Sequence, residues 1–221
     1  MKKILLAVLV LAMVFSFASC AKVLTYEEYV AADLESNVVV EAYVQDTQSW
    51  WDNKITVYAA DEDGAYFLYE LACSEEDAAK LTPGTKIKVS GRKTAWSGEV
   101  EIVDATFEFA GEETYVATAK DVTSKLGTDE LINYQNQLVT FKGLEVVSVS
   151  YKGDARGDDV YLKVKNDKGT YDFCVEKYLT DENTDVYKAV EALKAGDKVD
   201  VTGFAYWYNG INTHVTAVVK K

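Results

Sequence analysis

Two stretches of the chain, 112 residues apart, repeat one pattern. Residues 81–91 (LTPGTKIKVSG) match residues 193–203 (LKAGDKVDVTG). Each stretch continues into a segment that carries aromatic residues and reaches a second glycine, Gly98 or Gly210, at the same distance. An internal repeat of this kind indicates two similar domains rather than one large one. Each half must then build its own hydrophobic core, and any function must be placed on a small scaffold that occurs twice.

The beginning of the chain has the pattern of an export signal. Lys2 and Lys3 precede an apolar run at residues 4–17, which is shorter than the roughly 20 residues needed to span a bilayer. The end of the segment, Phe17-Ala-Ser-Cys20, resembles a bacterial lipobox, in which the cysteine becomes the lipidated first residue of the mature protein. The resemblance implies that Cys20 tethers the protein to the cell membrane or outer membrane, outside the cytoplasm, without a membrane-spanning segment.

The rest of the chain is long enough for two domains of about 100 residues each. We place the first domain at residues 21–110, a linker at 111–113 and the second domain at residues 114–221. Residues 22–113 hold 7 Lys or Arg and 20 Asp or Glu, a net charge of −13, whereas residues 114–221 hold 14 and 16, a net charge of −2. The first domain should therefore repel polyanions, and the second is close to neutral.

Hydrophobic periodicity and turn residues predict the same order of elements in both halves. In the first half we expect a helix at 26–34 with Thr25 as its N-cap, strands at 38–44, 54–59 and 65–73, a helix at 74–81, and strands at 85–94 and 99–109. In the second half we expect a weak helix at 128–134, strands at 138–151, 160–165 and 170–175, a helix at 185–193, and strands at 198–208 and 211–219. Residues 61–64 end in Asp-Gly, which is typical of a type I′ hairpin, and Gly143 predicts a bulge or bend in its strand.

Five strands, a helix between the third and the fourth, and a long bent first strand resemble the OB-fold, a small Greek-key barrel. The sequence thus predicts a mainly β protein of two tandem five-stranded OB-fold-like barrels. Overall it resembles bacterial secreted or lipid-anchored proteins built from such domains. The alternative is a pair of other small β-barrels or β-sandwiches. The resemblance implies that ligands lie across strands two and three, between the loop joining strands one and two and the loop joining strands four and five.

Aromatic residues gather in the loops that would flank such a ligand. The first domain offers Trp50, Trp51 and Trp96, with Tyr58 and Tyr69 as possible face residues; the second offers Tyr151, Lys152 and Arg156 in one loop and Tyr206, Trp207 and Tyr208 in the other. A base stacked on such a ring contributes about 1–3 kcal/mol, and sugar rings stack in the same way. The positive charge beside its aromatics favours the second domain, whereas the acidic first domain suits a sugar, a basic protein surface or a cation. The same rings could instead fill the barrel ends or join the two domains.

The residue inventory gives no reason to expect catalysis, a cofactor or a metal. The single histidine, His214, lies in the last predicted strand, and no Ser-His-Asp or Cys-His arrangement can be assembled around it. No zinc-ligand spacing and no phosphate-binding glycine loop is present, and the acidic runs at 61–63 and 158–159 lack a twelve-residue calcium loop. Cys73 and Cys174 are expected to be buried free thiols.

Two functions fit this sequence. The first is a non-catalytic, membrane-anchored, extracytoplasmic protein whose loop aromatics hold an extended ligand, either single-stranded nucleic acid or a glycan. The alternative is a structural or assembly lipoprotein of the cell envelope. In that case the aromatics are core or interface residues, and the acidity of the first domain selects a protein partner by charge complementarity.

Overall fold

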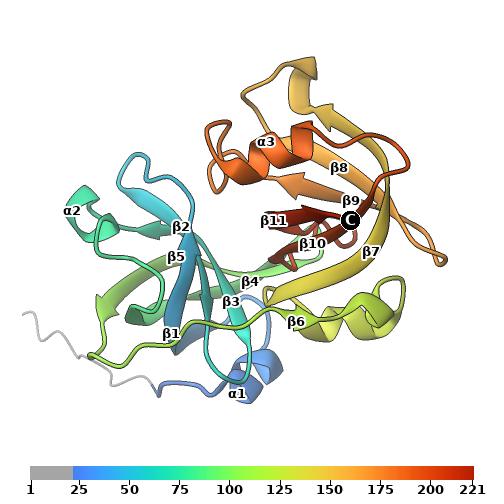
Figure 1. The fold of residues 1–221 in the computed structure, drawn as a ribbon. Coiled ribbons are helices and arrows are strands. Elements are labelled where there is room, and N and C mark those ends of the chain that lie inside the picture. The colour runs from blue at the N-terminus through green and yellow to red at the C-terminus, as the bar shows by residue number, and fades with distance from the viewer. Residues whose placement is uncertain (1–21) are drawn as a thin grey trace, which may run out of the picture.

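The computed structural model describes residues 22–221, so the predicted signal segment and Cys20 lie outside the described residues. Between residues 22 and 221, no helix is both long and apolar enough to cross a membrane. Figure 1 shows two β-barrels beside one another, joined by the segment that carries the short strand β6. The order of the elements is the same in both barrels, as the internal repeat predicts.

The first domain is a closed five-stranded barrel. Its strands are β1 (Asn37–Thr47), β2 (Lys54–Ala60), β3 (Ala65–Ala72), β4 (Lys86–Trp96) and β5 (Glu99–Phe109). Strands β1, β2 and β3 pair in sequence, β3 then pairs in parallel with β5, and β4 pairs with both β5 and β1. The resulting order, β1-β2-β3-β5-β4, closes on itself and is that of an OB-fold. Helix α1 (Tyr26–Ala31) precedes the barrel, and α2 (Glu75–Ala78) lies between β3 and β4.

The second domain repeats this topology. Its strands are β7 (Leu138–Tyr151), β8 (Val160–Lys165), β9 (Thr170–Val175), β10 (Lys198–Phe204) and β11 (His214–Lys220), with α3 (Asp185–Glu191) between β9 and β10. Strand β9 pairs in parallel with β11, and β7 pairs with β10 to close the ring. Strand β6 (Lys120–Asp121) adds to β7, and short 3₁₀ turns lie at Thr123–Lys125, Asp129–Tyr134 and Lys152–Asp154. The predicted fold of two OB-fold-like barrels, each with a helix between its third and fourth strands, is confirmed.

Local chemistry explains where the helices begin. Thr25 and Glu28 form a capping box at α1, as predicted, because each side chain accepts a hydrogen bond from the backbone N–H of the other residue. The side chains of Ser74 and Thr184 cap α2 and α3 in the same position. These caps satisfy N–H groups that would otherwise have no partner within the helix.

The two copies of the sequence repeat both keep a glycine in the fourth strand of the barrel, because no larger residue fits there. A Cβ on Gly91 would lie 2.6 Å from Ile102, and one on Gly203 would lie 2.2 Å from the carbonyl oxygen of His214. The strand register shifts beside each glycine, so both fourth strands bulge at this point. A bulge bends the strand so that it can pair with two neighbours around a small barrel. Gly143, with φ 67°, lies at the corresponding register shift of β7, and the predicted bend is confirmed.

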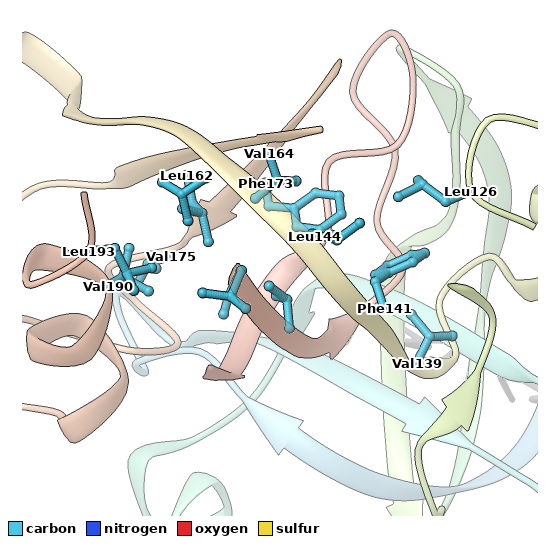
Figure 2. Close-up of a cluster of buried hydrophobic side chains, with 14 of the residues drawn as sticks. Leu126, Val139, Phe141, Leu144, Leu162, Val164, Phe173, Val175, Val190 and Leu193 are labelled. Carbon is cyan, nitrogen blue, oxygen red and sulfur yellow. The ribbon is translucent and has the colours of Figure 1, made fainter. Parts of the chain in front are cut away.

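Each barrel has its own core of alternating inward side chains. In the second barrel, side chains from β7, β8, β9 and the α3 region meet around Phe141 and Phe173, whose ring centroids are 5.2 Å apart. Figure 2 draws this cluster. The first barrel has a separate cluster that includes Val40, Val57 and Leu68. Cys73 and Cys174 are buried free thiols, as predicted.

Two local predictions are wrong. The turn at 61–64 is not type I′, because its central residues lack the positive φ that this turn requires. Instead the Asp61 carboxylate accepts hydrogen bonds from the N–H groups of Asp63 and Gly64, at 2.9 and 2.7 Å. Asn166 does the same for Lys168 and Gly169 in the second barrel, so the repeat includes this turn.

The second error concerns the last hairpin. Strand β10 ends at Phe204 and β11 begins at His214, whereas the sequence pattern extends the strands to 208 and from 211. Residues 205–213 leave the sheet because they contact the first barrel: the N–H of Trp207 donates to Glu99 at 2.8 Å, and the N–H of Asn209 donates to the carbonyl of Ser97 at 2.6 Å.

Candidate functional site

The two barrels pack against each other through the face that OB-folds commonly use for ligands. Tyr58 of β2 and Phe67 of β3 point away from the first barrel's core and form a third apolar cluster with Phe204. The Tyr58 ring stacks on Phe204 with centroids 4.3 Å apart, and Phe67 contacts Tyr206 at 5.2 Å. The second barrel therefore covers part of the β2–β3 face of the first.

A buried hydrogen-bond chain fixes this contact. Gln48 donates to the hydroxyl of Tyr58 at 3.1 Å, and that hydroxyl is hydrogen-bonded to Nδ1 of His214 on the second barrel. Burial lowers the pKa of His214 to about 3, so the imidazole is neutral. His214 therefore helps to hold the two barrels together.

The predicted aromatic cluster of the last loop is divided between the barrel contact and the surface. Tyr206 is half-buried, stacked on His214 with centroids 4.2 Å apart. Trp207 is half-buried and packs against the second core. Tyr208 is exposed, and its ring lies 5.3 Å from that of Trp96 in the first barrel. The last loop therefore supplies one exposed ring, Tyr208, to a surface shared by both barrels.

The charged residues that were predicted to bind a ligand in the second domain form ion pairs and hydrogen bonds within that domain. Arg156 donates to both carboxylate oxygens of Glu191, at 2.8 and 3.1 Å, and its guanidinium lies over the ring of Tyr187. The Tyr151 hydroxyl donates to the same Glu191 at 2.6 Å. Lys152 forms an ion pair with Asp159 at 3.1 Å. These contacts do not include Tyr206, Trp207 or Tyr208, so the structure does not assemble the two loops into one site.

The adjacent tryptophans of the first domain have different environments. Trp50 packs against the first core, and its indole Nε1 donates to the carbonyl of Cys73 at 2.8 Å. Trp51 is 70% exposed, the most exposed of the large hydrophobic side chains between residues 22 and 221. Only Trp51 can offer a ring face to a ligand.

A groove runs along the uncovered part of the β2–β3 face. One cavity of about 440 Å³ lies at the boundary between the barrels, and its lining includes Trp51 and Phe67 of the first barrel and Glu176 and Tyr178 of the second. A second cavity of about 640 Å³ continues over the first barrel toward Trp96. Lys54, Tyr69 and Glu70 line both cavities, so the two adjoin each other, and together we refer to them as a groove.

Exposed rings are concentrated along this groove. Five aromatic side chains that are 43–70% exposed lie in its lining or beside it: Trp51, Tyr69, Trp96, Tyr178 and Tyr208. Sequence analysis named four of them but not Tyr178, which follows β9 in a segment without a periodic pattern. We call this surface the aromatic groove.

The aromatic groove is acidic. Its two cations already have partners, since Lys54 pairs with Glu70 at 2.7 Å and Arg92 pairs with Asp104 at 2.8 Å. Three further carboxylates in the lining, of Asp52, Glu101 and Glu176, have no ion-pair partner among residues 22–221. Burial raises the pKa of Glu101, and burial together with the nearby Asp159 raises that of Glu176 to about 7.

Another carboxyl, that of Glu99, is enclosed where the barrels meet. It is fully buried on β5, and its Oε2 accepts hydrogen bonds from the N–H of Trp207 and the side chain of Gln135, at 2.8 and 3.3 Å. Its Oε1 has no hydrogen-bond partner. Burial raises the pKa of Glu99 to about 8, although the Trp207 N–H acts in the opposite direction. Near neutral pH this group is therefore mostly protonated.

Metal binding gains no support from the geometry. In the part of the chain from residue 22 to residue 221, no three His, Cys, Asp or Glu side chains form a group that could hold a metal ion. The acidic turn at 61–63 uses its Asp61 carboxylate to cap its own backbone.

No family model matches the chain, and no curated protein matches it either. Among solved structures, a murine DNA-binding protein bound to double-stranded DNA is similar over 83% of this chain and 96% of its own, at 14% identity and a TM-score of 0.40. The Ifi202 HINa domain in complex with 20-bp double-stranded DNA covers 84% of this chain and 99% of its own, at 15% identity and a TM-score of 0.39. The p204 HINb domain covers 86% and 100%, at 12% identity and a TM-score of 0.38. Likenesses at these TM-scores say nothing about the ligand of this chain.

Proposed function

We propose that the protein is a non-catalytic binding protein that holds an oligosaccharide in the aromatic groove. The observation that carries this proposal is the gathering of five exposed aromatic rings along the groove, which begins on the β2–β3 face and extends across β5 and β4. Isolated exposed apolar residues are ordinary, but a contiguous set marks a binding surface. This face and its flanking loops are also where OB-folds bind oligonucleotides and oligosaccharides.

The charge of the groove favours a sugar over nucleic acid. Phosphodiester ligands need Lys and Arg side chains that are free to contact them. Both cations of the groove, Lys54 and Arg92, are paired, and three carboxylates without ion-pair partners lie beside them. Those carboxylates would repel phosphates, whereas they can accept hydrogen bonds from sugar hydroxyl groups. Aromatic faces with polar acceptors between them suit a polyhydroxylated ring.

The closed barrels also disfavour an extended peptide. Peptides commonly bind sheets by adding a strand at a free edge. Strand β4 of the first barrel has partners on both sides, β1 and β5, and β3 likewise pairs with β2 and β5. A ligand on this face must therefore bind through side chains, as a stacked sugar does.

Export and lipid attachment at Cys20 form part of the same proposal. They are supported by the apolar run at residues 4–17 and the Phe17-Ala-Ser-Cys20 segment. In the source cell, the wild-type protein should sediment with membranes, and the Cys20→Ala variant should be found in the soluble fraction or remain unprocessed. If both variants fractionate and migrate alike, the lipid anchor is excluded. The alternative role, as an envelope assembly protein, stays a prediction and would be supported by a stoichiometric protein partner of the groove.

The binding proposal is tested by a screen of oligosaccharides, followed by titration of the purified protein. Loss of one stacked ring corresponds to about 1–3 kcal/mol, so Trp51→Ala and Tyr178→Ala should each weaken binding about fivefold or more. The matched control is Phe109→Ala, which removes a ring that is 43% exposed and lies outside the groove.

Two results would contradict the proposal. Unchanged affinity in both groove variants would show that the ligand binds elsewhere. Tight binding of a single-stranded oligonucleotide that weakens steeply with added salt would identify nucleic acid as the ligand instead.

A further inference from the structure

We propose that the aromatic groove selects oligosaccharides that carry free amino groups, and that Glu101 and Glu176 receive the ammonium groups. This inference rests on the proposed function, because it names the class of sugar held by the same groove. It is carried by two enclosed carboxylates that lack counter-ions.

Glu101 lies in the floor of the groove. It is on β5 opposite Phe67, in the parallel register of β3 and β5, and only 7% of it is exposed. Its side chain lines the 640 Å³ cavity, and within residues 22–221 it has neither an ion pair nor a side-chain hydrogen bond. Enclosing a carboxylate without a partner is unfavourable, and such a group is a common mark of a functional site.

Glu176 lies in the wall that the second barrel contributes. One of its oxygens, Oε2, accepts the backbone N–H groups of Tyr178 and Leu179, both at 3.0 Å. These bonds hold the side chain in place at the 440 Å³ cavity, next to the exposed ring of Tyr178. Lys177, whose Nζ lies 5.0 Å from the centre of that ring, is paired with Asp158 rather than with Glu176.

Aromatic faces and unpaired carboxylates together attract the same chemical group. An ammonium ion is drawn to the face of a Trp or Tyr ring, and it donates three hydrogen bonds that a carboxylate can accept. The groove has exposed rings at Trp51, Tyr69 and Tyr178, while its own cations are paired with Glu70 and Asp104. A 2-amino sugar offers both a ring surface for stacking and an ammonium group for the carboxylates.

The test compares two oligomers of the same length and linkage, one with free amino groups and one with N-acetyl groups. One is a β-1,4-linked glucosamine hexamer with free amines, and the other is its fully N-acetylated counterpart, both titrated near pH 7, where Glu176 is about half ionised, at low and high salt. We expect the amine oligomer to bind about tenfold more tightly at low salt, with the preference falling as salt rises. Glu101→Gln and Glu176→Gln should each reduce this preference, because each should weaken binding of the amine oligomer more than binding of the acetylated oligomer. Glu108→Gln, on the same strand but outside the groove lining, should retain the full preference.

The outcomes separate this inference from the function on which it rests. Equal binding of both oligomers, or a preference that survives both groove substitutions, overturns the amine selection and leaves oligosaccharide binding intact. Binding of a different neutral glycan, with neither oligomer bound, also overturns the amine selection alone. Failure of every oligosaccharide to bind overturns the proposed function and this inference together.

Discussion

Replacing Glu99 with Gln should stabilise the protein in a pH-dependent way. Glu99 is enclosed where the two barrels meet, and burial raises its pKa from 4.5 to about 8. Gln is a close match for the protonated carboxyl. Its oxygen can accept the Trp207 N–H and the Gln135 amide, as Oε2 does now, and its NH₂ group takes the place of the unpartnered Oε1.

The sign of the effect follows from the raised pKa. Below pH 4.5 the carboxyl is protonated in the folded and unfolded protein alike, so it contributes no penalty. As the pH rises from 4.5 to about 8, the unfolded chain ionises while the folded protein holds its proton, and stability falls. At about 1.36 kcal/mol per pH unit, the full interval corresponds to about 5 kcal/mol. Local opening of the contact between the barrels would let water reach the ionised Glu99 and would limit the loss of stability. We therefore expect the unfolding free energy of Glu99→Gln to exceed that of the wild type by about 1 to 5 kcal/mol at pH 8.

The assay is denaturant unfolding of wild type and Glu99→Gln at pH 5 and pH 8, followed by tryptophan fluorescence. Glu176, whose pKa is also raised, is present in both proteins, so its effect cancels in the difference between them. The difference in unfolding free energy should be small at pH 5 and clearly in favour of the variant at pH 8. An equal difference at both pH values would refute the reasoning, because it would show that Glu99 does not retain its proton in the folded protein.

Three further substitutions test the barrel contact and the repeat. Tyr58→Phe removes the hydroxyl that is hydrogen-bonded to His214 and should lower the unfolding free energy by about 1–3 kcal/mol. The loss should be the same at pH 5 and pH 8, because the pKa of His214 is about 3. A loss that differs between these pH values would contradict the neutral histidine. Gly64→Ala places a Cβ 2.2 Å from the Tyr26 ring and should lower the melting temperature, whereas Gly169→Ala, at the equivalent turn of the second barrel, meets its nearest atom at 3.2 Å and should have a smaller effect. Equal melting temperatures for the two glycine variants would show that the contact between α1 and the turn is not tight.

The sequence predicted the barrels because their strands depend on local patterns. Alternation of inward and outward side chains, the capping residues Thr25 and Ser74, and the repeated glycine of the fourth strand are all visible within short windows. The strand bounds at 99–109, 138–151, 160–165 and 170–175 agree with the structure. The turn at 61–64 was assigned the wrong type because the Asp61 side chain caps it. The other error lies where residues 205–213 contact the other barrel, a long-range interaction that no local pattern reports.

The site was only partly predictable for the same reason. Glu99 and Glu101 alternate with apolar residues on β5, which is the ordinary pattern of a solvent-facing edge. The second barrel covers that face, and the two carboxyl groups become enclosed. In the sequence, Tyr206 and Trp51 are both aromatic residues of predicted loops. In the structure, Tyr206 is held between the barrels and Trp51 faces solvent. The similar loops of the two barrels correctly indicated that the fold is repeated. They could not show which of their aromatic rings stay exposed.

Duplication has given the two barrels unequal roles. In the first barrel, the outward face of β2 and β3 carries Tyr58, which is covered by the second barrel, and Phe67 and Tyr69, which line the groove. The corresponding strands of the second barrel, β8 and β9, carry an ion pair between Lys163 and Asp172 instead. The second barrel contributes a wall, through Glu176 and Tyr178, and the loop that holds the barrels together. Because Ser49 donates to the carbonyl of Tyr178 at 2.7 Å, the wall is attached directly to the loop that bears Trp51. The aromatic groove is therefore a property of the pair, and neither barrel alone contains all of the rings and carboxylates that line it.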